Sequence, residues 1–225
     1  MLTAYITHPS FLRHEMGPDH PEAPERLIAI QDYLGATGVL DFTVPYVATP
    51  ATDLAIERAH TSLYWAELRD MAPQTGYTRV DPDTLMNPHT IEAARHAAGA
   101  VVQAIDLVLD GQCGNAFCAV RPPGHHAERA VAMGFCFVNN VAVGALHALD
   151  VRGLSRVAVV DFDVHHGNGT EDILAGDDRV LMVSTFQHPL YPFMGEIPKG
   201  NNMCNVPLQP RSRGDVMREA VEILW

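Results

Sequence analysis

The sequence predicts an α/β protein whose helices flank a mainly parallel, doubly wound sheet. Short apolar runs of strand length alternate with longer stretches of helical periodicity, which is the pattern of successive β-α units. The run beginning at Val157 is rich in β-branched residues, as in strands buried on both faces of a parallel sheet. The chain has 225 residues, 47% of them hydrophobic, and shows no repeats or linkers. It therefore suits one domain with one core.

Local signals place the individual elements. The first helix is expected directly after Pro24, the last proline of a polar loop. The clearest helix has Asn87 as its N-cap, Pro88 at its first position and an Ala-rich run that stops before Gly111. A turn-rich loop over residues 81–87 is expected to precede it. We expect strands over residues 4–8, 44–48, 116–120, 157–165 and 180–186, and helices over residues 25–34, 52–60, 63–71, 88–109, 140–149 and 170–174.

A last helix is expected from Asp215 onward, because apolar residues up to Leu224 recur on one helical face. The sequence stops at Trp225 without a C-cap or a following strand. An apolar helix face in an α/β unit needs a strand to cover. We therefore expect residues 1–225 to form a single domain that is incomplete at its C-terminus.

Composition excludes several classes of function. The formal net charge is −12 with no basic cluster, so direct nucleic-acid binding is not expected, whereas a cationic substrate would suit the acidic chain. No basic and apolar leader and no bilayer-length apolar stretch is present, so we expect neither export nor membrane insertion. The cysteines show no Cys-x-x-Cys spacing and are expected to be reduced thiols of a cytoplasmic protein; they are Cys113, Cys118, Cys136 and Cys204.

The stretch from Val157 to Thr170 carries the strongest chemical signal. Asp161, Asp163 and His165 stand at alternate positions, so on a strand their side chains would share one face. The carboxyl end of a strand is where ligands bind in open α/β sheets. A helix-capping role for the aspartates would account for one carboxylate. Three polar side chains ending an apolar strand favour a bound cation, because burying unpaired carboxylates is costly.

A second loop presents adjacent imidazoles at the end of another strand. The segment Arg121-Pro-Pro-Gly-His125-His126 follows the expected strand over residues 116–120. Its prolines fix the backbone. A single histidine there would more often be a structural residue, but a rigidly held pair facing another polar strand end favours a functional role.

Together these motifs resemble the zinc-dependent histone deacetylase family. The resemblance runs from the segment His20-Pro-Glu-Ala-Pro-Glu-Arg26 to the end of the chain. It rests on Arg121-Pro-Pro-Gly-His-His-Ala127, Gly134-Phe-Cys-Phe-Val-Asn-Asn140 and Asp161-Phe-Asp-Val-His-His-Gly-Asn-Gly169. It implies a three-layer arginase/deacetylase-like α/β fold with a mainly parallel central sheet flanked by helices, the last units missing. The motifs resemble those of class II members, including bacterial histone deacetylase-like amidohydrolases and acetylpolyamine amidohydrolases.

The resemblance assigns roles to individual residues. Asp163 and His165 become zinc ligands, and His125 and His126 become the tandem general acid/base pair. Asp161 orients His125, and Asn168, which is Asp in class I members, is the partner of His126. Gly134 and Phe135 match one wall of the substrate tunnel, Tyr191 its opposite aromatic side and Asp83 the carboxylate at its rim. A potassium ion near the zinc would use Asp161, Asp163, the His165 carbonyl, Ser184 and Thr185.

The function implied is zinc-dependent hydrolysis of the amide of acetyl-lysine or of a related acylated amine such as an acetylpolyamine. Bacterial members often associate, which makes a homo-oligomer compatible with the resemblance. The family's third zinc ligand and its carbonyl-polarising Tyr or His lie beyond Trp225. We therefore expect a deacetylase as the full-length product and weak or no activity from this chain alone.

Two other functions are compatible with parts of the sequence. An arginase-like binuclear manganese hydrolase requires a second carboxylate at the position of Gly167, which makes that chemistry unlikely. The other is a non-catalytic module, derived from the family by truncation, that binds acylated ligands or a partner. The paired histidines weigh against it, because binding alone does not require an acid/base pair.

Overall fold

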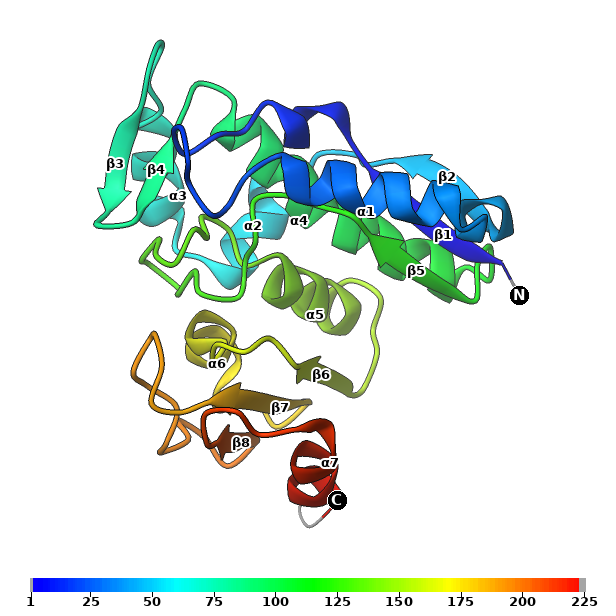
Figure 1. Ribbon diagram of the computed structural model, residues 1–225, viewed down its shortest axis with the longest axis vertical. Coiled ribbons are helices and arrows are strands. Elements are labelled where there is room, and N and C mark those ends of the chain that lie inside the picture. Colours follow the sequence, from blue (N-terminus) through cyan, green and yellow to red (C-terminus); the bar gives the residue numbers. More distant parts are fainter. Residues whose placement is uncertain (1, 223–225) are drawn as a thin grey trace.

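The computed structural model describes residues 2–222, and Figure 1 shows their course. No helix within this range is both long and apolar enough to cross a membrane. The strands are β1 (Thr3–Thr7), β2 (Thr43–Val47), β3 (Thr78–Asp81), β4 (Thr84–Met86), β5 (Asn115–Cys118), β6 (Val157–Asp161), β7 (Val180–Gln187) and β8 (Met203–Leu208). The α-helices are α1 (Glu25–Ala36), α2 (Asp53–Ala59), α3 (Ser62–Asp70), α4 (Thr90–Leu109), α5 (Asn140–Asp150), α6 (Asn168–Leu174) and α7 (Gly214–Glu222), and the short 3₁₀ helices are η1 (Pro9–Leu12) and η2 (Val39–Phe42).

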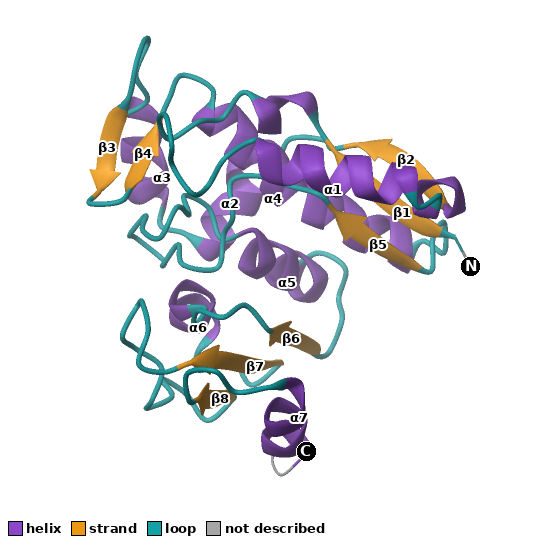
Figure 2. Ribbon diagram, in the orientation of Figure 1, coloured by secondary structure: helices purple, strands orange, loops and turns teal. Residues whose placement is uncertain are grey.

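The strands form parallel sheets flanked by helices, as the sequence predicts (Figure 2). One three-stranded parallel sheet has the order β2-β1-β5 and a second has the order β6-β7-β8, while β3 and β4 form an antiparallel hairpin. The two parallel sheets are separate, because within residues 2–222 no strand pairs with the outer edges of β5 and β6. Residues of both edges, together with α4 and α5, line an apolar groove of about 600 Å³.

Helices α4 and α5 hold the two halves together. Small residues allow their close approach: a Cβ on Gly144 of α5 would lie 2.5 Å from Cγ1 of Val101 on α4. On the other side of α4, a Cβ on Gly99 would lie 1.8 Å from the carbonyl oxygen of Thr49. In Figure 1, α5 lies between the upper sheet and β6. The Ala- and Gly-rich sequences of these helices are therefore a packing requirement.

Two local expectations before α4 are wrong. The helix begins at Thr90 with His89 as its N-cap, two residues later than the Asn87-Pro88 signal predicts. Asn87 Oδ1 accepts a hydrogen bond from the backbone N–H of His89 at 3.1 Å and so stabilises a turn ahead of the helix. Residues 81–87, expected as a loop, contain the end of β3 and the whole of β4, since the turn signals there form a hairpin.

The strand β6 also differs from expectation. It ends at Asp161, so Asp163 and His165 follow the strand and do not share a strand face with it. Burial on both faces is wrong as well, because Val160 is 53% exposed where β6 borders the groove. At the other end of the chain, α7 confirms the helix expected from Asp215, and none of its described residues is buried; Leu224 and Trp225 lie outside the described range.

Candidate active site

The loop that carries the paired histidines is anchored by a buried ion pair. Arg121 is fully buried and donates from Nε and Nη2 to the two carboxylate oxygens of Glu22, each at 2.7 Å. Its Nη1 donates to the backbone carbonyls of His14, at 2.9 Å, and of Phe11. A bidentate pair of this kind has a defined direction as well as a charge. The first residue of the loop is therefore fixed to the segment of residues 11–22.

Each histidine of the pair is bonded through Nδ1 to a different partner. His125 Nδ1 lies 2.9 Å from Asp161 Oδ2, and His126 Nδ1 lies 2.8 Å from Asn168 Oδ1. Both acceptors are oxygens, so both imidazoles carry their hydrogen on Nδ1. The two ring centroids are 4.0 Å apart. The loop after β5 and the segment after β6 thus meet here, as expected for neighbouring strand ends.

The two imidazoles differ in electrostatics. Burial lowers the pKa of His125, but the hydrogen bond and charge of Asp161, with the charge of Asp163, outweigh burial and leave the pKa above its ordinary value. For His126, burial and then the charge of His125 lower the pKa to about 4. The pKa of Asp161 is raised by burial and lowered more strongly by His125, so it lies below its ordinary value. At neutral pH, His126 is therefore the neutral imidazole of the pair.

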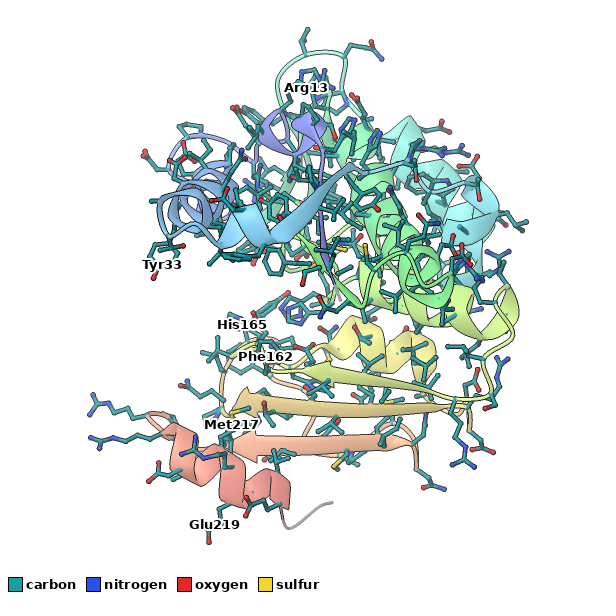
Figure 3. The ribbon with its side chains drawn as sticks, turned by 90° about the vertical axis from the view of Figure 1, so that its right-hand side faces the viewer. Arg13, Tyr33, Phe162, His165, Met217 and Glu219 are labelled. Atoms are coloured by element: carbon teal, nitrogen blue, oxygen red, sulfur yellow. The ribbon has the colours of Figure 1, made fainter. Side chains whose placement is uncertain are left out.

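Asp163 and His165 follow the end of β6 in the chain. The ring centroid of His165 is 5.8 Å from that of His126, and Figure 3 shows His165 at the boundary between the two halves of the molecule. The turn that presents them is closed by Asp161 Oδ1, which accepts from the backbone N–H of Asp163 at 3.1 Å. Asp163 Oδ1 lies 2.9 Å from His165 Nδ1. Phe162, between the two aspartates, is 77% exposed. The turn, and not strand alternation, brings the two candidate ligands together.

A carboxylate and an imidazole at this separation are donors that zinc prefers. They fit two positions of a zinc site, and their side chains are 49% and 38% exposed, which leaves them accessible to an ion. Within residues 2–222 no group of three or more His, Cys, Asp or Glu side chains is arranged to hold a metal. The described residues therefore offer a pair of candidate metal ligands, Asp163 and His165.

The predicted tunnel residues gather around the same point. Gly134 has φ +55°, and a Cβ there would lie 2.5 Å from Cδ2 of His126, so only glycine allows this approach. The N–H of Phe135 donates to Thr84 Oγ1 at 3.0 Å, and Thr84 Oγ1 donates to Asp83 Oδ1 at 3.0 Å. Buried Thr84 therefore links the wall to the candidate rim carboxylate.

Tyr191 lies on another side of the imidazole pair. Its ring centroid is 5.1 Å from that of His126 and 6.1 Å from that of His165, in edge-to-face arrangements. Its hydroxyl is buried without a hydrogen-bond partner among the described residues. Burial, and then the charge of Asp83, raise the pKa of Tyr191. The segment of residues 187–193 thus delivers an aromatic ring to the site.

The candidate potassium ligands come from neighbouring strands. Asp161 of β6 and Ser184 of β7 are directly paired in the parallel register, and Thr185 follows on β7. Ser184 Oγ lies 3.1 Å from His166 Nδ1. Buried His166 also places Nε2 2.8 Å from Glu171 Oε2. Ser184, His166 and Glu171 therefore form a continuous hydrogen-bonded chain next to Asp161.

Sequence reasoning missed Glu128. The Nδ2 of Asn168 donates to Glu128 Oε1 at 2.9 Å, so the bond from His126 to Asn168 continues to a carboxylate. Glu128 stands two residues after His126, directly behind the motif that was recognised. Its position next to the histidine pair was the available signal. Nothing in the sequence alone shows that it reaches Asn168.

Comparisons with known proteins agree with this geometry. Residues 20–225 match the histone deacetylase domain. The uncharacterised protein slr0245 of Synechocystis is 41% identical over 227 residues, which cover 98% of this chain and 74% of that protein. The polyamine deacetylase HDAC10 of Mus musculus is 36% identical over 208 residues, 87% of this chain and 31% of that protein. The crystal structure of the HDA15 HD domain superposes with a TM-score of 0.85 at 36% identity, covering 92% of this chain and 61% of the other.

The fold and the site together define a member of a deacetylase family of hydrolases. The chain belongs to the histone deacetylase domain family.

Proposed function

We propose that this chain carries the acid/base half of a zinc-dependent deacetylase site, which hydrolyses the amide of acetyl-lysine or of a related acylated amine such as an acetylpolyamine. Two hydrogen bonds support this proposal most directly: Nδ1 of His125 is bonded to Asp161, and Nδ1 of His126 is bonded to Asn168. Nε2 of each imidazole is then available for proton transfer beside Asp163 and His165.

The residues divide the proton transfers between them. His126, neutral because its pKa is about 4, accepts the proton of the attacking water at Nε2. His125, whose pKa is raised by Asp161 against the effect of burial, donates the proton that the leaving amine requires. Each positioned transfer contributes roughly 10²- to 10⁴-fold to the rate. When bound at Asp163 and His165, zinc supplies a Lewis acid that polarises the acyl carbonyl and acidifies water.

The surroundings support an acylated amine as substrate. Phe135 and Tyr191 provide aromatic surface for a long apolar stem. Acetylation removes the charge that would oppose entry of a lysine or polyamine chain between such rings. Asp83 provides a hydrogen-bond acceptor, and Thr84 connects it to the backbone of Phe135. The net charge of −12 attracts cationic partners. A potassium ion at Asp161 and Ser184, paired across β6 and β7, would stabilise the segment that carries the zinc ligands.

Zinc affinity tests the metal assignment. We expect the purified chain to bind zinc weakly, because a structural or catalytic site normally supplies three or four protein ligands. His165→Ala should lower this affinity by at least roughly tenfold, since even the loss of a residue that only orients a ligand costs about 10- to 100-fold. His89→Ala, at the N-cap of α4 where the side chain makes no capping hydrogen bond, is the matched control and should bind as the unmodified chain does. Equal zinc affinity in the chain and in His165→Ala would contradict the assignment.

A further inference from the structure

We propose that Glu128 is a positioning residue that fixes the amide orientation of Asn168 and thereby holds His126 as the Nδ1–H tautomer, with Nε2 free to accept a proton. This inference rests on the proposed function, in which His126 is the base. It concerns one continuous chain of three side chains, from His126 through Asn168 to Glu128.

The geometry gives this chain a direction. Asn168 Oδ1 lies 2.8 Å from His126 Nδ1, and Asn168 Nδ2 lies 2.9 Å from Glu128 Oε1. A carboxylate can only accept, so the NH₂ end of the amide must face Glu128 and the oxygen must face His126. An amide oxygen can only accept as well. The hydrogen of His126 is therefore held on Nδ1.

An asparagine needs this help where an aspartate would not. A carboxylate presents acceptors in every rotamer, as Asp161 does to His125 at 2.9 Å. An amide turned by 180° would instead present its NH₂ group to His126 Nδ1 and favour the Nε2–H tautomer, which cannot accept a proton from water. Asn168 is fully buried, so water does not compete for its two ends.

The position of Glu128 is set independently of its side chain. Its carbonyl oxygen accepts from Nδ1 of buried His60 at 2.9 Å, and its N–H donates to the carbonyl of Val131 at 2.9 Å. Nε2 of His60 accepts from the N–H of Asn139 at 2.9 Å. Because both bonds use the backbone atoms of Glu128, removing its carboxylate leaves them in place. Met133 Sδ, 3.4 Å from Asn168 Nδ2, is the remaining and weaker acceptor.

The experiment is a two-bond ¹H–¹⁵N correlation spectrum of the chain labelled with ¹⁵N-histidine, recorded at neutral pH without metal or substrate. The signal of His126 is assigned by its loss in His126→Gln. His60, whose tautomer is fixed by backbone groups, is the internal reference. We expect His126 in the unmodified chain to show a protonated Nδ1 and an unprotonated, acceptor-type Nε2.

Four variants give the critical comparison. Glu128→Ala removes the carboxylate, and the bulkier Glu128→Leu does the same if the smaller side chain perturbs folding. In both, the tautomer ratio of His126 should move toward Nε2–H by roughly 10- to 100-fold, which corresponds to one charge-assisted hydrogen bond. Glu128→Gln keeps an acceptor oxygen and should restore the original ratio. The double variant Glu128→Ala/Asn168→Asp should restore it too, because a carboxylate at position 168 needs no second anchor.

An unmodified chain with Nε2–H at His126, or a Glu128→Ala or Glu128→Leu variant that keeps Nδ1–H while His60 is unchanged, would overturn the proposal. Because the measurement involves neither zinc nor turnover, its failure is distinct from failure of the proposed function. Loss of zinc binding or hydrolysis would leave the tautomer result intact.

Discussion

Replacing Arg121 by methionine should destabilise the domain strongly, with a characteristic dependence on pH. Met keeps much of the side-chain volume but removes the guanidinium that pairs with Glu22. Glu22 is 7% exposed, so its carboxylate would keep the exposed Arg26, at 3.7 Å, as its nearby permanent cation among the described residues, beside the titratable His14 at 3.6 Å. The carbonyls of Phe11 and His14 would also lose their donor.

Breaking a buried pair by removing one partner costs about 3–5 kcal/mol, because the other charge remains buried. The remaining charge of Arg26 should reduce this loss of stability. The backbone carbonyls of Phe11 and His14, which lose their hydrogen-bond donor, should increase it. For a domain of this size, each kcal/mol shifts the melting temperature by about 2–4 °C. Arg121→Met should therefore lower the melting temperature by roughly 10 °C.

The pH dependence follows from His14. This buried imidazole has Nε2 3.6 Å from Glu22 Oε2, and burial, then the charges of Arg121 and His20, lower its pKa to about 3. Because the folded-state pKa lies below the unfolded value of about 6.5, this imidazole contributes stability above that unfolded value. The contribution is lost as the pH falls from about 6.5 toward the folded-state pKa. Without Arg121, the folded-state pKa of His14 rises, since protonated His14 can pair with Glu22. The penalty of Arg121→Met should thus be smaller at about pH 5 than at about pH 8.

The assay is urea unfolding followed by circular dichroism at both pH values, for the unmodified chain, Arg121→Met, Glu22→Gln and the double variant. Coupling of the two side chains should make the double variant more stable than the sum of the single effects predicts, by about 1–3 kcal/mol. Additive effects, or a penalty for Arg121→Met that grows on acidification, would refute this account of the pair.

Two further predictions concern the site and its support. Gly167→Ala would place a Cβ 2.3 Å from Asp161 Oδ2, so the carboxylate must move and its bond to His125 should be lost; the low-field Nδ1–H proton signal of His125 should disappear, and its persistence would contradict the close contact. Burial, against hydrogen bonds to backbone groups at positions 128 and 129, lowers the pKa of His60 to about 4. Since a lowered histidine pKa stabilises above the unfolded value, stability should fall by about 3 kcal/mol as pH drops from about 6.5 to about 4. His60→Gln should show a flatter dependence in the same range, and an unchanged slope would exclude His60 as its origin.

Much of the fold was determined by local sequence. Periodicity and capping signals place α1, α5 and the strands β1 and β7 within a few residues of where they occur, because these patterns act over one or two turns. The strand β8 was not predicted. The sequence motifs around His125 and Asp161 could be recognised together as those of one family. The match to the histone deacetylase domain confirms that resemblance. The roles given to individual residues stay predictions.

Tertiary structure decided what lies between segments distant in sequence. The signal at Asn87 stabilises a turn in place of the helix N-terminus because the β3–β4 hairpin precedes it. Asp163 and His165 meet through a turn after β6, which alternation did not predict. The bonds from Glu22 to Arg121 and from Asn168 to Glu128 span 99 and 40 residues. A sequence determines which chemical groups are available, whereas folding determines which donor meets which acceptor, because that choice depends on how helices and sheets pack.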